Sequence, residues 1–299
     1  MQCVSILMTI LPLAFHRTKS HHVIVVHPFE NNAPWWIRPQ LWGLDIMLVA
    51  LAWGLAYSKM LWIIGLPGEP LFLLCVCVWG FVLIMRMLKV IIYKSDPHAC
   101  WRPEFYQARF IPLAYLIIAA LLAALWLGLY QVGIGLLTFC SIPALCTALA
   151  LMVPYLWKNR ILQTALIALS FAGACSAPAW YYSITAPIAN IILFPPTLCF
   201  AALVMLHLLS RHAWLQQGQE QNRIVGLLPV FLLALLLACL ILANIMPPYE
   251  RCFYYTIAIG AACLQVLDRY RHRMTTDQLF AIGWLSLALP ALSAFLFQN

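Results

Sequence analysis

Charged side chains are scarce in this sequence. Its 299 residues include 17 Lys and Arg and 9 Asp and Glu, so 9% of the chain is charged, whereas a soluble domain carries about 25%. Apolar and aromatic residues make up 65%, and the mean hydropathy is +0.91. So few charges cannot cover a water-exposed surface, which excludes a cytosolic enzyme and a disordered chain. The net charge of +8 is too thinly spread for nucleic-acid binding. The composition therefore indicates a polytopic membrane protein.

The sequence also lacks the short motifs that mark common enzyme chemistries. It contains no phosphate-binding P-loop, dinucleotide-binding, zinc-protease or serine-hydrolase motif. The 11 cysteines form no CxxC pair, and they lie mostly in apolar segments, where Cys behaves as a small apolar residue. Of the eight histidines only His207 falls in a membrane segment, so a haem held between two histidines is not favoured. We therefore predict no cofactor and no metal site, and the motifs identify no catalytic residue.

Long apolar runs are abundant instead. A helix needs about 20 apolar residues to cross a bilayer, and runs without period-2 alternation favour helices over barrel strands. The sequence thus predicts an all-α, polytopic integral membrane helical bundle of about nine transmembrane helices. The predicted spans are Leu41–Tyr57, Leu71–Tyr93, Phe110–Tyr130, Gly133–Trp157, Ile161–Tyr182, Ile188–Leu209, Ile224–Met246, Cys252–Leu267 and Leu279–Phe297.

The connections between these runs are short and leave no room for a soluble domain. We expect residues 1–40 to form a cytoplasmic or interfacial segment and residues 41–299 to form a single transmembrane domain. Positive charges in short loops stay in the cytoplasm. With nine spans and a cytoplasmic N-terminus, 15 of the 17 Lys and Arg fall on the inner side, and only Lys59 and Arg251 fall outside. We therefore predict a multi-pass inner-membrane protein with its C-terminus outside.

Polar residues inside the predicted spans gather in the cytoplasmic half. Intramembrane charges are costly and are functional candidates by default. The substrate-binding candidates are Asp45, Arg86, Lys89, His207 and Arg211. Asp45 is the expected partner of Arg86, because an unpaired carboxylate in a span is expensive. The alternative is that Arg86 and Lys89 extend to the headgroups. The one-sided distribution favours a polar cavity that opens on the cytoplasm.

The outer half offers few polar groups. Asn190 and Asn244 lie close to the surface, and we interpret Glu69 and Glu250 as loop residues beside prolines. Several prolines fall within the predicted spans, where they tend to kink helices; they are Pro143, Pro178, Pro195, Pro196, Pro229 and Pro290.

Three stretches resemble a divergent bacterial branch of the UbiA-type intramembrane prenyltransferases, whose layout is also nine spans with the N-terminus inside. They are LVALAWGLA (48–56), ILQTALIALSFAGACSAPAW (161–180) and VLDRYRHRMTTDQL (266–279). In that family, Asp-rich motifs at the inner ends of the second and sixth spans hold magnesium and the prenyl diphosphate. Here Arg86 and Lys89 occupy the first position, and His207 and Arg211 occupy the second.

The resemblance therefore implies the fold of the family without its magnesium-binding acids. We expect a multi-pass membrane protein with a cytoplasm-facing cavity for an isoprenoid or another membrane lipid. Either catalysis is lost, or Arg86, Lys89 and Arg211 engage an anionic headgroup without metal. Two other classes remain open. A small-solute or lipid transporter would need polar residues on both sides, and a non-catalytic subunit of a membrane complex would need no motif at all.

Overall fold

The computed structural model describes residues 37–63, 65–92, 105–106, 108–156, 160–183, 193–215 and 223–297, and all of them belong to one compact unit, Ala33–Asn299. Helices dominate, and no strand occurs in these ranges. This is expected for apolar segments, because only a helix satisfies its own backbone polar groups without water. The long helices are α3 (Leu44–Met60), α4 (Gly68–Ile92), α6 (Phe110–Trp126), α7 (Ile134–Leu156), α8 (Arg160–Tyr182), α10 (Pro195–Leu215), α11 (Arg223–Ile245), α12 (Pro248–Tyr270) and α13 (Thr276–Phe297).

These nine helices coincide with the nine predicted spans, but they are not equally suited to a membrane. Six apolar segments are long enough to cross it; they lie in α4, α6, α8, α10, α11 and α13. Helix α3 has only 17 residues, and the described apolar part of α7 is Thr138–Met152. Helix α12 begins and ends with charged residues. The protein is therefore a helical multi-pass membrane protein with six candidate spans in the described ranges, and nine spans remain a prediction.

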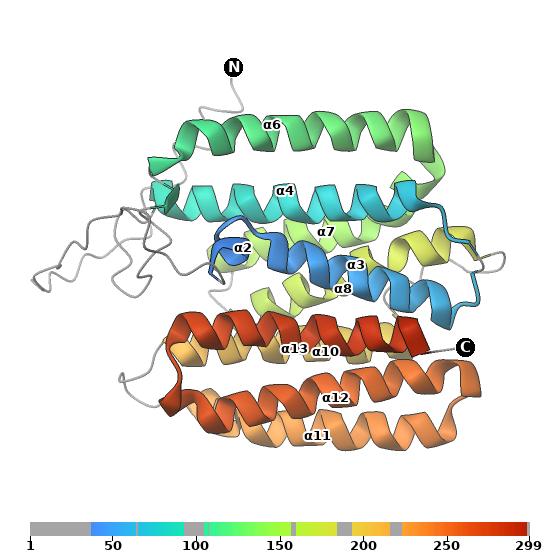
Figure 1. Ribbon diagram of the computed structural model, residues 1–299, viewed down its shortest axis with the longest axis vertical. Coiled ribbons are helices and arrows are strands. Elements are labelled where there is room, and N and C mark those ends of the chain that lie inside the picture. Colours follow the sequence, from blue (N-terminus) through green and yellow to red (C-terminus); the bar gives the residue numbers. More distant parts are fainter. Residues whose placement is uncertain are drawn as a thin grey trace, which may run out of the picture. The chain divides into compact units, whose positions relative to one another are not determined.

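The helices pack side by side, with α3 and α8 at the centre (Figure 1). Helix α3 contacts α4, α8, α12 and α13, and helix α8 contacts α7 and α10. Helices α11, α12 and α13, drawn in orange and red, form an adjacent group. Helix α6 packs mainly on α4, and only 22% of its apolar segment is buried. Large apolar side chains such as Ile111, Tyr115 and Leu122 are exposed along it, as expected for a lipid-facing helix.

Aromatic side chains fill the space between α3, α10 and α12. The rings of Trp53 and Phe200 stack with centroids 3.9 Å apart, and Phe253 meets Trp53 edge-on at 5.2 Å. Tyr57 lies 4.7 Å from Phe253. The Trp53 indole N–H donates to the carbonyl of Leu287 in α13 at 3.1 Å. This aromatic core joins four helices and leaves no polar group of Trp53 unsatisfied.

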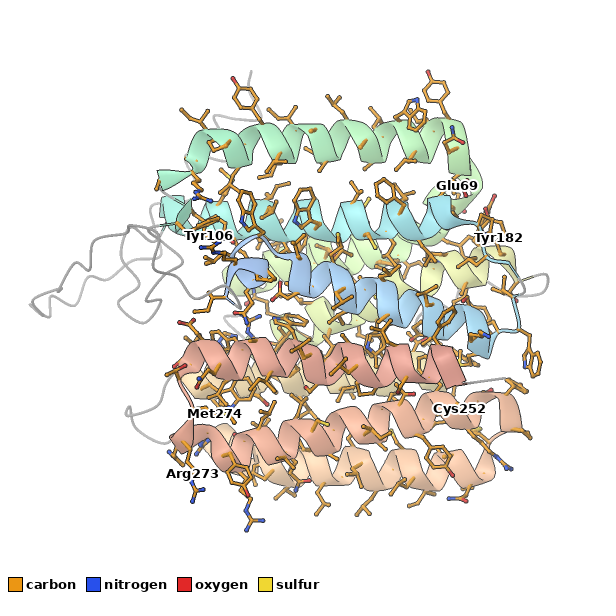
Figure 2. The ribbon with its side chains drawn as sticks, in the orientation of Figure 1. Glu69, Tyr106, Tyr182, Cys252, Arg273 and Met274 are labelled. Carbon is orange, nitrogen blue, oxygen red and sulfur yellow. The ribbon has the colours of Figure 1, made fainter. Side chains whose placement is uncertain are left out.

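Described residues that the charge pattern assigns to one side of the membrane lie at one end of the helices. Tyr106, Arg273 and Met274 are found at this end, and Glu69, Tyr182 and Cys252 are found at the opposite end (Figure 2). This arrangement agrees with the predicted alternation of helix direction. Below, "inner end" means the end with Arg273, and "outer end" means the end with Glu69. Which end faces the cytoplasm remains a prediction from the charges.

Two predicted boundaries are wrong. The first predicted span, Leu41–Tyr57, is broken: a short helix α2 (Arg38–Leu41) ends before Gly43, which has a φ of +73°, and α3 begins at Leu44. The sixth, Ile188–Leu209, is displaced, because α10 runs from Pro195 to Leu215. A proline pair suits the first turn of a helix, where the missing N–H would have no partner. The predicted segment of residues 1–40 lies largely outside the described residues.

Candidate functional site

The predicted ion pair between Asp45 and Arg86 is confirmed. A guanidinium Nη2 of Arg86 lies 3.7 Å from Asp45 Oδ1, and the two side chains are 15% and 9% exposed. Asp45 is the second residue of α3, and Arg86 lies in the inner part of α4. Asp45 is therefore closer to the helix start than the sequence predicted. In the first turn the free backbone N–H groups favour a negative charge.

The turn between α2 and α3 brings backbone acceptors to the same guanidinium. Gly43 adopts a left-handed conformation, and a Cβ there would come within 3.6 Å of Arg86 Nη1. This turn directs the carbonyl of Gln40, the residue before the last in α2, at Arg86 Nη1, which donates a hydrogen bond to it. The adjacent indole of Trp79 donates to the carbonyl of Trp42 at 2.7 Å. Glycine at position 43 thus permits the left-handed turn, while a Cβ there would make only ordinary van der Waals contacts.

Tyr106 completes this cluster from outside the three helices. Its hydroxyl donates to the carbonyl of Leu41 at 2.6 Å and accepts a bond from Arg86 Nη1 at 3.3 Å. Tyr106 is 2% exposed, and it lies at the inner end (Figure 2). The Arg86 guanidinium therefore has three partners within the protein. These contacts link α2, α3 and α4.

Lys89 belongs to the last turns of α4, but its side chain lies outside the described part of the structure. Its predicted role toward an anionic group stays a prediction.

His207 occupies a second cluster, formed by α10 and α13. The displaced boundary of α10 places it two turns before the helix end, so it does not close the span as predicted. Its exposed fraction is 0%, and in the part of the chain that the structure describes neither ring nitrogen has a hydrogen-bond partner. The ring of Trp284 lies 4.5 Å from the imidazole. A Cβ at Gly283 would come within 3.0 Å of His207 Cε1 and 3.2 Å of the Trp214 ring, so only glycine lets both rings pack on α13.

Trp214 and Arg211 extend this second cluster by one turn each along α10. The indole nitrogen of Trp214 is buried and has no hydrogen-bond partner. The Arg211 guanidinium lies over the rings of Phe280, at 4.6 Å, and Trp284, at 5.5 Å, a cation–π geometry. The cluster therefore combines a cation, an indole donor and an imidazole that offers one donor and one acceptor.

Four of the five predicted site residues are thus distributed over two clusters, and the side chain of the fifth, Lys89, lies outside the described part of the structure. Asp45 and Arg86 bind to each other and to α2, and His207 and Arg211 face α13. We call these the α4 cluster (Asp45, Arg86, Gln40, Tyr106) and the α10 cluster (His207, Arg211, Trp214, Trp284). The Arg86 guanidinium of the α4 cluster has partners in Asp45, the Gln40 carbonyl and the Tyr106 hydroxyl. Three nitrogens of the α10 cluster have no hydrogen-bond partner among the described residues.

The sequence interpretation missed buried polar groups at the outer end. Glu250 is 5% exposed and lies in the first turn of α12, so its interpretation as a loop residue is wrong. The hydroxyls of Tyr57 and Thr197 are also buried there, and neither forms a hydrogen bond of normal geometry. The pattern of polar residues in the sequence could not reveal these two hydroxyls, because Tyr and Thr are common in apolar segments. The outer half is therefore more polar than predicted.

The magnesium site of the UbiA-type enzymes does not fit these residues. Magnesium prefers oxygen ligands, chiefly carboxylates, whereas the corresponding positions carry Arg86 in α4 and His207 and Arg211 in α10. Across the described ranges no three His, Cys, Asp or Glu side chains lie together in a way that could hold a metal ion.

Comparison with known proteins adds no assignment: no protein-family model, curated protein or solved structure matches this chain.

Proposed function

We propose that this membrane protein binds the polar head of an isoprenoid or a related lipid in the α10 cluster. The observation that supports this proposal is that three buried nitrogens, two of His207 and one of Trp214, have no hydrogen-bond partner among the described residues. Each buried unpaired group costs about 1–3 kcal/mol. A ligand head with oxygen acceptors and one hydroxyl would satisfy all three. Arg211, one turn away, would supply charge to an anionic head.

The lipid class is supported by the resemblance to the UbiA-type enzymes and by the setting. The α10 cluster lies in an apolar helix of a multi-pass protein, which suits a ligand with a long apolar tail. His207 and Trp214 are 0% and 1% exposed, so binding requires α10 and α13 to separate locally. We propose binding without magnesium-dependent prenyl transfer, because basic side chains occupy the positions where acids would be needed. Asp45 and Arg86 then serve to position α2, and Lys89 is left as an interfacial contact for an anionic group.

Mass spectrometry of lipids that copurify with the detergent-solubilised protein tests this proposal. The variants are His207→Leu and Arg211→Met, each of which retains most of the packing volume. Matched controls at the same end are His272→Gln and Arg273→Met, because both residues are exposed. Arg273 also lies over an aromatic ring, that of Tyr270, at 5.7 Å.

We expect the wild type and both controls to retain one isoprenoid or one minor lipid, and the two α10-cluster variants to lose at least 80% of it. Recovery of the same bulk phospholipids from all five proteins would contradict the proposal. It would favour a non-catalytic subunit of a membrane complex.

A further inference from the structure

Glu250 is a buried acid without a countercharge. Its side chain is 5% exposed, and the Tyr254 hydroxyl donates to its Oε2 at 3.4 Å. Among the described residues no cationic side chain forms an ion pair with it. Arg251, the next residue, is exposed, and its Nε donates to the carbonyl of Met246. The only polar contacts of this carboxyl in the described ranges are therefore with the phenols of Tyr254 and Tyr249.

Among the described residues, the groups that act on Tyr254 are neutral and polar apart from Glu250. The cation of Lys59, near the end of α3, lies over the Phe295 ring of α13. The thiols of Cys199 in α10 and Cys239 in α11 face Tyr254, and Tyr57 in α3 faces it as well. Thr197, at the start of α10, lies beside the Tyr57 hydroxyl. Phenol, thiol and hydroxyl groups are all neutral near pH 7. They cannot compensate an ionised carboxyl by charge.

Two opposing effects act on the ionised form of Glu250. The free N–H groups in the first turn of α12 favour a negative charge, but this effect is small. Burial without a counter-ion opposes ionisation more strongly, so burial is the larger effect. Burial raises the pKa of Glu250, and hydrogen bonds from Tyr254 and Tyr249 oppose part of this increase. The charge can be neutralised by a proton or by a metal cation.

The residues present favour the proton. A metal ion would need several ligands, and among the described residues no group of three His, Cys, Asp or Glu side chains could hold one. A proton needs only the carboxyl oxygen and its phenol partner. We propose that Glu250 is a proton-binding site at the outer end, and that loss of its proton loosens the packing of α12 against α3 and α10. This site is separate from the α10 cluster and does not depend on the proposed lipid.

Thermal unfolding of the full chain in detergent between pH 5 and pH 9 tests this inference. The variants are Glu250→Gln, which mimics the protonated acid, and Glu69→Gln as a matched control. Glu69 also lies in the first turn of a helix at the outer end, but it is exposed. Each series is run in choline chloride and in sodium chloride at the same ionic strength.

The direction in which stability changes with pH follows from the raised pKa of Glu250. The folded state holds the proton more strongly than the unfolded state, so the stability decreases as the pH rises toward the folded-state pKa. We expect the wild type and Glu69→Gln to lose about 2–8 °C in midpoint relative to Glu250→Gln between pH 5 and pH 9. Tyr254→Phe, which removes a bond to the ionised form, should raise the pKa of Glu250 further and extend this loss to higher pH.

Two results would overturn the inference. Identical pH profiles for the wild type and Glu250→Gln would mean that Glu250 does not titrate in this range. Stabilisation of the wild type by sodium over choline, abolished by Glu250→Gln, would identify a metal-cation site instead. If Glu250→Gln fails to fold, the shift between the wild type and Tyr254→Phe decides alone, and its absence refutes the proton site.

Discussion

The α4 cluster makes a quantitative prediction for a double-mutant cycle. Asp45→Asn removes the charge that faces Arg86 and keeps its shape, while Arg86→Met removes the guanidinium and keeps much of the aliphatic chain. At the observed 3.7 Å two unit charges attract by about 4 kcal/mol at an effective dielectric constant of 20. Desolvation and access to the interface reduce this, so we expect a coupling energy of about 1–2 kcal/mol.

The single variants should differ in a way that the geometry determines. Asp45→Asn leaves Arg86 its bonds to the Gln40 carbonyl and the Tyr106 hydroxyl, so we expect a loss of about 1–3 kcal/mol. Arg86→Met removes those bonds too and leaves Asp45 without the guanidinium as its counter-ion. We expect this variant to lose about 2–4 kcal/mol of unfolding free energy. The double variant should lie within about 1 kcal/mol of Arg86→Met, because removing Asp45's charge then removes a penalty.

The assay is equilibrium unfolding in mixed micelles, followed by the fluorescence of the 12 tryptophans. Tyr106→Phe serves as a control, since it removes one acceptor of Arg86 and leaves both charges in place. Strictly additive losses for Asp45→Asn and Arg86→Met would refute the ion pair as an energetic contact. Arg86 would then be held chiefly by the backbone of α2.

Three further predictions concern packing, metal and topology. Gly283→Ala should lower the midpoint of thermal unfolding and cost about 1–3 kcal/mol of stability, because the added Cβ meets two rigid rings. The control Gly226→Ala should be neutral or stabilising, because a Cβ there has nothing within 4 Å. Equal effects of the two substitutions would contradict the packing of the α10 cluster. Prenyl transfer by the purified protein with aromatic acceptors should show no magnesium-dependent turnover, and robust turnover would mean that scattered acids suffice. A reporter active only outside the cytoplasm should be active when fused after Asn299 and silent in the 94–109 loop, and the reverse pattern would invert the topology.

The positions of the helices could be predicted because hydrocarbon leaves the chain few choices. A run of about 20 apolar residues must be helical in a membrane, and all nine predicted runs coincide with long helices. The ends of the helices were harder to predict from the sequence. The pair Pro195–Pro196 was interpreted as an interior kink, yet α10 begins at Pro195, because local propensity at a helix end outweighs the apolar pattern around it.

The candidate site was predictable only where charge was involved. Asp45 and Arg86 stood out because a charge in an apolar run needs a partner, and the pair is present. The orphaned nitrogen of Trp214 and the burial of Glu250 depend on which face of α10 or α12 meets its neighbours. A single sequence indicates the buried face of a helix only through a weak apolar periodicity. The buried positions of Trp214 and Glu250 therefore became clear only from the packing of the helices.

The hydrogen bond from Trp53 to the carbonyl of Leu287 spans 234 residues, which has a consequence for biosynthesis. Neighbouring helices such as α7 and α8, or α11 and α12, can pair as soon as they leave the translocon. Helix α3 can pair early with α4 and α8, but its contact with α13 must wait, because α13 is made after every other described helix. Until then the indole N–H of Trp53 lacks the Leu287 carbonyl as its acceptor. Ribosome-bound chains that stop before α13 should therefore retain an incompletely packed α3, and the centre of the bundle closes only once α13 has entered the membrane.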